Sequence, residues 1–209
     1  MASLRERLVF DAEAGKVRDG PRRYLLMRPD VLMGMFARLD SKARGAALQA
    51  FAASAEQQGG DSLAAYFESL GRDPEALLEA TAAAAADLGW GRWSFRPEGE
   101  VLRLVVTDSP FAHGFDASIA AGAADPASVA GGDPFDAGVL GDSAPVCAPI
   151  RGLLAATARL VWGAQVSARA ADAADPIEVE EPIEVEELTC AAAGSACCEF
   201  VARRRALVR

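Results

Sequence analysis

The spacing of apolar residues changes at Gly89, and this change limits the folds that the chain can adopt. Before Gly89, apolar residues recur three and four positions apart among many alanines, which is typical of packed helices. After Gly89, apolar and polar residues alternate, which is typical of strands with one buried face. A helical half followed by strands predicts an α+β domain with helices packed on a twisted antiparallel sheet.

The helices of the first half are expected from residues that start or stop helices. Asp30 is expected to cap the first of them. A longer helix is expected over residues 41–58, ending at Gly59-Gly60, and Asp61 is expected to cap the next. Asp73-Pro74 then opens an alanine-rich helix, because proline suits the first helical position.

The strands are expected in three places. Residues 24–27 predict a short apolar strand, and residues 91–109 predict a hairpin around a Pro-Glu-Gly turn. Residues 117–144 have few large side chains and predict a flexible insertion. A helix from Pro149 to Gly163 should follow, and then two strands, one through the PIEVEE repeat and one at CEFVARR.

Composition restricts the kind of protein. The 209 residues are 51% hydrophobic, enough for a sizeable core, and the net charge of −9 argues against binding nucleic acid or an anionic membrane. No apolar run reaches the roughly 18 to 20 residues of a membrane span, and no secretory segment opens the chain. We therefore expect a cytoplasmic protein whose four cysteines are thiols or metal ligands rather than disulfides.

The duplicated hexapeptide PIEVEEPIEVEE leads directly into three of the four cysteines. Alternate residues of a strand face opposite sides, so Ile183, Val185 and Glu187 share the apolar face while the other glutamates of the second copy face solvent. An ionised carboxylate directed at a core is costly unless it is paired or bound to a cation. Glu187 therefore needs a partner.

In one interpretation that partner is a metal ion that the cysteines also bind. Cys190 and Cys198 follow Glu187, and Cys147 precedes the expected C-terminal helix; three thiolates and a carboxylate suit Zn²⁺. In the other interpretation the cysteines are small buried residues, because this spacing is not a strong zinc signature. Cys197 and Cys198 would face opposite ways, so only one of them can be a ligand. The predicted structural zinc ligands are Cys147, Glu187, Cys190 and Cys198.

Aromatic residues around the hairpin and on the last helix could line a pocket for a flat apolar ligand or could simply fill a core. These candidates are Trp90, Trp93, Phe95, Phe111 and Trp162. Asp108, Ser109 and His113 are the residue types of a catalytic triad, but no nucleophile elbow surrounds Ser109. Catalysis is not predicted there.

Two segments resemble the 4-vinyl-reductase domain family: PVCAPIRGLLAA at residues 145–156, and E-x-x-C-A-A-A-G-S-A-C-C-E-F-V at residues 187–201. The opening RERLVFDAEAGKVRDGPRRYLLM is similar to the segment before this domain in the sensor modules of xylene- and phenol-responsive transcription activators. The resemblance implies a fold like that of transport-particle subunits, a small hydrophobic ligand pocket and a homodimer. It divides the chain into residues 1–28, a dimerisation element, and residues 29–209, the ligand-binding domain.

The same resemblance implies a zinc ion held by three cysteines and one glutamate. These match the four residues already predicted, although a longer interval after Cys147 leaves Glu181 as an alternative to Glu187. Val106 stands where phenol sensors have a tryptophan that fixes the hydroxyl group of the ligand, so Val106 is a pocket candidate but phenol recognition is not implied.

These observations together predict a non-enzymatic sensor or carrier domain that binds a small planar ligand, aromatic or tetrapyrrole-like, beside a structural zinc. One alternative is an accessory or carrier protein of bacteriochlorophyll biosynthesis, which the name of the family suggests. No flavin or nicotinamide motif is visible, so reductase activity is not expected. Another alternative is an adaptor whose own side chains fill the pocket.

Overall fold

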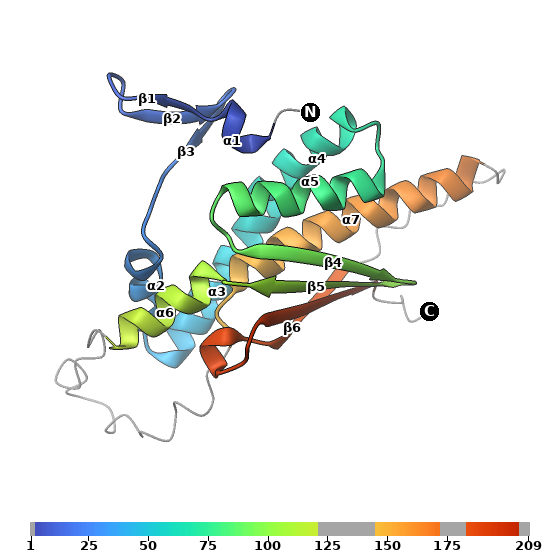
Figure 1. Ribbon diagram of the computed structural model, residues 1–209. Helices are drawn as coiled ribbons and strands as arrows, with labels where there is room; N and C mark the ends of the chain where they lie inside the picture. Colours follow the sequence, from blue (N-terminus) through green and yellow to red (C-terminus); the bar gives the residue numbers. More distant parts are fainter. Residues whose placement is uncertain (1–2, 121–144, 172–182, 205–209) are drawn as a thin grey trace.

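The structure is a computed structural model that describes residues 3–120, 145–171 and 183–204 (Figure 1). Its helices are α1 (Leu4–Arg7), α2 (Pro29–Ala37), α3 (Ser41–Ser54), the π-helix η1 (Ala55–Gly59), α4 (Gly60–Ser69), α5 (Pro74–Asp87), α6 (Pro110–Ala120), α7 (Ala148–Ala171) and the 3₁₀ helix η3 (Ala191–Ala193). Its strands are β1 (Val9–Asp11), β2 (Lys16–Asp19), β3 (Arg22–Tyr24), β4 (Arg92–Glu98), β5 (Val101–Thr107), β6 (Ile183–Thr189) and β7 (Cys198–Arg204).

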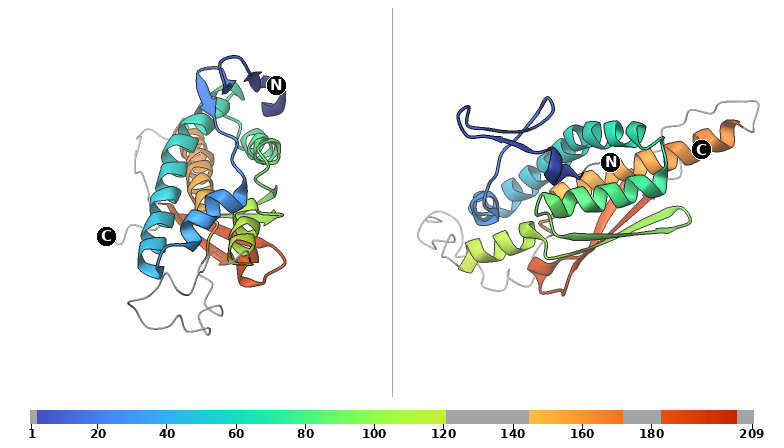
Figure 2. Two further views of the ribbon diagram at one scale, coloured as in Figure 1. Left: turned by 90° about the vertical axis from the view of Figure 1, so that its left-hand side faces the viewer. Right: turned by 45° about the horizontal axis from the view of Figure 1, so that its top comes forward.

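The main sheet is antiparallel, with strand order β4-β5-β7-β6. Helices α5 and α7 pack against it, and α3 and α4 pack on α7 (Figures 1 and 2). Alternation along β5 explains this layering, because Leu102, Leu104 and Val106 are all buried and face the helices beside Phe200 of β7. The predicted α+β fold, with helices on a twisted antiparallel sheet, is confirmed.

A second, three-stranded sheet, β1-β2-β3, lies in the N-terminal arm, residues 3–28, and projects from the helical layer (Figures 1 and 2). Helix α1, the first element of the arm, packs against α5 of the main body. The strand predicted over residues 24–27 is wrong beyond its first residue: β3 ends at Tyr24, and the next three residues are exposed and lead into α2.

Two helix boundaries differ from the prediction. Asp73 does cap α5, accepting a hydrogen bond from the backbone N–H of Glu75 at 3.0 Å. Asp30 is not a cap, because Pro29 occupies the first turn of α2 and places the N-cap at Arg28, with which Asp30 forms an ion pair.

The predicted stop at Gly59-Gly60 is also wrong, since α3, η1 and α4 follow one another without a break and Asp61 lies inside α4. The glycines serve packing instead. A Cβ on Gly59 would lie 2.3 Å from Cδ2 of Leu153, and one on Gly60 would lie 3.3 Å from Cβ of Ala156. Close approach to α7 therefore overrides the helix-stopping tendency of this pair.

In the C-terminal half the hairpin is confirmed as β4 and β5. Helix α7 begins at Ala148 and continues past Gly163, because a single glycine inside a long helix is tolerated. Residues 117–120 belong to α6; the rest of the predicted insertion and the first PIEVEE copy lie outside the described residues. Of the described helices, none has the length and hydropathy that a membrane crossing requires.

Candidate functional site

Four predicted ligand residues converge beside the first turn of α7. Cys147 directly precedes α7, Glu187 lies on β6, Cys190 begins the turn after β6, and Cys198 begins β7. One sulfur or oxygen atom from each lies within 4.8 Å of the others, and the sulfur of Cys147 is 3.5 Å from that of Cys198 and 4.0 Å from that of Cys190. We call these residues the thiol–carboxylate cluster.

Local geometry explains why the last three residues meet. The pairing of β6 with β7 shifts register between Glu187 and Thr189, and the chain then turns through η3 and Gly194, whose φ of 86° suits glycine. The backbone N–H of Ala191 donates to the sulfur of Cys198 at 3.3 Å, which closes the turn. The turn therefore folds Cys190 back onto the start of β7.

The carboxylate of Glu187 is the unsatisfied group of the cluster. Both of its oxygens are buried, and neither has a hydrogen-bond partner among the described residues. Burial, and then the nearby charge of Cys190, raise the pKa of Glu187 to about 9. An unpartnered buried carboxylate beside three sulfurs is the arrangement that a bound cation would satisfy.

In the absence of a cation, the pKa values of two of the thiols shift in opposite directions. Hydrogen bonds from Cys147 and Cys190 lower the pKa of Cys198 to about 4, whereas hydrogen bonds to Cys190 and Cys198 and then burial raise the pKa of Cys147. These shifts favour the thiolate form of Cys198 and the protonated form of Cys147. This buried set of three cysteines and one glutamate could hold a metal ion.

The candidate triad residues lie near the cluster but are not arranged for catalysis. The hydroxyl of Ser109 lies 3.3 Å from the sulfur of Cys147, His113 is exposed, and Asp108 pairs with Arg92 at 3.2 Å. These three candidate triad residues therefore form no triad. Glu181, the alternative ligand, lies outside the described residues, and Cys197 is not a member of the cluster.

An apolar cavity of about 290 Å³, partly open to solvent, is the second feature. Its walls come from the N-terminal arm, the α3–η1–α4 helical run, α5, the start of β4 and α7. The lining residues are Leu4, Tyr24, Phe51, Ser54, Ala55, Gln58, Gly59, Ser62, Leu63, Tyr66, Thr81, Ala84, Ala85, Leu88, Trp90, Trp93 and Leu153.

Two of the six predicted pocket residues, Trp90 and Trp93, line this cavity. The other four do not. Phe95 packs on Trp93 and Phe111 on Trp90, with ring centroids 6.0 and 5.1 Å apart, which places both behind the wall. Val106 is fully buried in the sheet, and Trp162 is buried in α7 with Arg204 over its ring.

The π-helix η1 shapes one wall, contributing Ala55, Gln58 and Gly59. It follows a close crossing of α3 by α7: a Cβ on Gly152 would lie 2.0 Å from the carbonyl oxygen of Ala52. A π-turn widens a helix by one residue and is frequent at functional sites. The wide turn therefore lies directly after the point where α3 and α7 are in contact, and it lines the cavity.

The N-terminal arm forms another wall that sequence reasoning missed. Leu4 of α1 is buried in the cavity, and Tyr24 ends β3 beside it. The segment is short and highly charged, so its apolar residues show no periodicity from which their burial could be predicted. Only the tertiary contact places them at the site.

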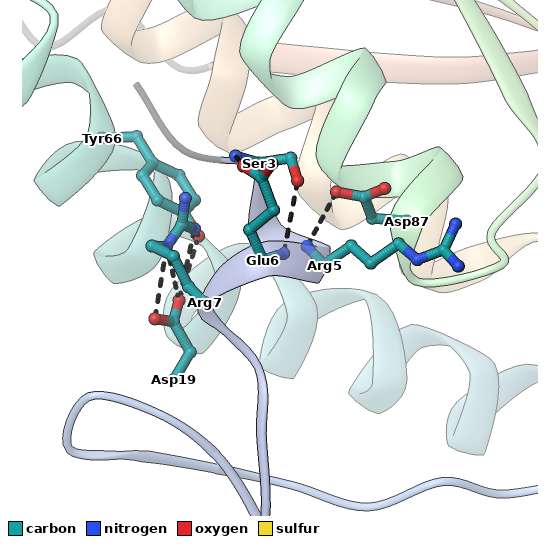
Figure 3. Close-up of polar contacts among 7 residues, drawn as sticks. All are labelled: Ser3, Arg5, Glu6, Arg7, Asp19, Tyr66 and Asp87. Carbon is teal, nitrogen blue, oxygen red and sulfur yellow. Dashed lines mark hydrogen bonds and ion pairs between the residues drawn. The ribbon is translucent and has the colours of Figure 1, made fainter.

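Polar contacts hold this wall against the body (Figure 3). The side chain of Arg7 pairs with Asp19 at 3.3 Å, donates a hydrogen bond to the hydroxyl of Tyr66, and lies over the Tyr66 ring at 4.9 Å. The hydroxyl of Tyr66 in turn donates to Asp19 at 3.4 Å. The backbone N–H of Arg5 donates to Asp87 at 3.0 Å, tying α1 to the end of α5.

Comparison with known proteins finds no matching family model and no matching curated protein. Among solved structures, the phenol-responsive sensory domain of the transcription activator PoxR, solved with phenol, aligns with a TM-score of 0.64 at 16% identity. The alignment covers 96% of this chain and 86% of that one. The chain shares this fold.

A trafficking protein particle complex subunit 3 from Naegleria fowleri, covalently bound to palmitic acid, aligns with a TM-score of 0.48 at 10% identity, over 87% of this chain and 97% of that one. Since no family model matches, membership of the 4-vinyl-reductase domain family stays a prediction.

Proposed function

We propose that this chain is a non-enzymatic domain that binds a small aromatic ligand in the apolar cavity and a structural Zn²⁺ in the thiol–carboxylate cluster. The observation that carries the ligand is the cavity itself, an apolar space of about 290 Å³ that two tryptophans help to line. The shared fold with a sensory domain solved with phenol supports the same class of ligand.

Cavity size favours one ligand class over the others. An engineered apolar cavity of about 150 Å³ holds benzene, so roughly twice that space suits one or two fused rings. A tetrapyrrole has four pyrrole rings and is a poorer fit, which disfavours a carrier role in bacteriochlorophyll biosynthesis. Open space is also unexpected in an adaptor whose pocket its own side chains fill.

Zinc is the metal that the donor set favours. Three soft thiolates and one carboxylate provide four ligands, the number that structural zinc takes in tetrahedral geometry. The unpartnered carboxylate of Glu187 supports a cation there, because thiols alone leave it unsatisfied. Elemental analysis of the purified protein should find about one zinc per chain; no zinc, or zinc retained after Cys190→Ser and Cys198→Ser, would exclude this site.

The ligand is tested by calorimetric titration with 2-naphthol, a two-ring probe. Binding of one molecule per chain is expected, with a negative change in heat capacity because apolar surface is buried. Protoporphyrin IX is the four-ring comparison and should bind more weakly. No detectable binding of 2-naphthol, or tighter binding of protoporphyrin, would contradict the proposed ligand class.

We also propose that the N-terminal arm mediates a homodimer. Its apolar side chains Val9, Phe10, Leu25, Leu26 and Met27 are exposed by half or more, and such large exposed apolar side chains are what an interface with a second copy would bury. A second copy of the arm is the partner that this proposal names. Light scattering should give a dimer that Phe10→Asp and Leu25→Asp together convert to a monomer; a monomeric wild type would contradict it.

A further inference from the structure

The cavity has one wall that does not belong to the helical layer or the main sheet. Leu4 and Tyr24 line it, and both belong to the N-terminal arm, which is joined to α2 by exposed residues. A ligand in the cavity would therefore touch the arm on one side and the body, for example Leu63 and Trp93, on the other. The described structure shows this wall in place.

The wall is held by a small set of contacts. Arg7 and Asp19 of the arm meet Tyr66 of α4, and the backbone of Arg5 meets Asp87 of α5. Arg22 adds a longer bond, 3.5 Å, to the carbonyl of Asp61. Apart from buried Leu4, most apolar side chains of the arm face solvent. Among the described contacts, docking of the arm therefore involves buried Leu4 together with several part-buried or exposed polar contacts.

Tyr66 belongs to both systems. It is one of the residues that line the cavity, and its hydroxyl accepts from Arg7 and donates to Asp19. Neither Arg7 nor Asp19 lines the cavity. Whatever those two residues contribute to ligand binding must therefore act through the position of Tyr66 and of the arm.

We propose that docking of the N-terminal arm is coupled to occupancy of the cavity, and that Arg7 and Asp19 are the positioning residues that hold the arm as the closing wall. This rests on the proposed function, since it takes the cavity as the ligand site. A ligand that contacts both the arm and the body binds the docked state more tightly, so it shifts the population toward that state. Conversely, loosening the arm lowers apparent affinity by the fraction still docked.

Hydrogen exchange of the full chain, with and without saturating 2-naphthol, tests the coupling directly. Amides of residues 4–7 and 22–24 should exchange more slowly when the probe is bound. The same amides in Arg7→Gln should exchange faster without the probe. Its affinity for 2-naphthol should fall by about threefold to tenfold, as expected when the docked fraction falls by that factor.

Matched variants separate positioning from general damage. Arg18→Gln removes an arm ion pair of 3.2 Å, to Asp11, that does not involve the body, and it should leave both exchange and affinity unchanged. Asp19→Asn should reproduce the effect of Arg7→Gln, and Arg7→Lys should restore part of the affinity by keeping the charge. Thermal midpoints of all variants show whether the main domain stays folded.

The outcomes are distinct. If 2-naphthol binds but leaves arm exchange unchanged, or if Arg7→Gln and Asp19→Asn bind it like wild type, the coupling is wrong and the proposed function stands. If 2-naphthol and other one- and two-ring probes do not bind, the proposed function fails and the coupling fails with it. Protection of the arm by the probe, lost in Arg7→Gln and kept in Arg18→Gln, supports it.

Discussion

The thiol–carboxylate cluster and the cavity are built in opposite ways. The cluster gathers four ionisable side chains within 4.8 Å and buries a carboxylate that lacks a partner. The cavity gathers side chains from both sheets and several helices, most of them apolar, around space that they do not fill. Metal binding by the cluster would contribute directly to the free energy of folding, whereas the cavity is partly open to solvent, so the cluster should control stability and the cavity should control binding.

The largest effect is expected when the cluster loses a ligand. Cys198→Ser should release zinc and lower the thermal midpoint by more than about 10 °C, because structural zinc contributes directly to folding. Cys197→Ser, one residue away and outside the cluster, is the matched control and should change neither zinc content nor midpoint appreciably. If the two variants change zinc content and thermal midpoint equally, the cysteines of the cluster behave as ordinary core residues and not as metal ligands.

The next effect concerns pH in the chelated, metal-free protein. Since folding raises the pKa of Glu187 from 4.5 to about 9, the protonated form is favoured, so its stabilising contribution is present below about pH 4.5 and is lost as pH rises through 9. Glu187→Gln stays uncharged and should become more stable than wild type by several kcal/mol across that range.

Urea unfolding at about pH 5, 7 and 9 measures this difference. Glu186→Gln, on the exposed face of β6 where it pairs with Arg203 at 3.1 Å, should parallel wild type. With zinc bound the sign reverses, because Glu187→Gln then loses a ligand. If the difference in unfolding free energy between wild type and Glu187→Gln is constant across the pH range, ionisation of Glu187 does not destabilise the metal-free protein.

The smallest effect on stability, and a clear one on binding, is expected in the cavity. Ala84→Phe fills part of the space from α5 and should weaken 2-naphthol binding by about tenfold or more, which corresponds to roughly 1.4 kcal/mol. Ala83→Phe places the same ring on the exposed side of that helix and should bind the probe like wild type. Calorimetry and thermal unfolding of the pair would show whether binding and stability separate as the comparison requires.

The cluster could largely be predicted from the sequence because its signals are local. Alternation along a strand and the cost of burying a charge identify Glu187, and short spacing adds Cys190 and Cys198. Cys147 is far away in sequence, and it was proposed as the remaining thiol that would complete a tetrahedral set, which the family resemblance also implies.

The cavity was only partly predictable, since Leu4, Tyr24 and Leu153 meet through tertiary contacts that no short pattern encodes. Gly59 shows the same limit, because packing against α7 replaced the helix stop that its residue type predicts.

Gly152 has a consequence for recognising distant relatives. A side chain there would collide with the carbonyl oxygen of Ala52 at 2.0 Å and the backbone nitrogen of Glu56 at 2.8 Å, so the helix crossing admits only glycine. This position falls five residues after Cys147, on the same first turns of α7. The spacing Cys-x4-Gly, followed later by Glu-x2-Cys-x7-Cys, is the pattern that relatives sharing both the cluster and this helix crossing are expected to keep. It can be searched for where overall identity is too low to align.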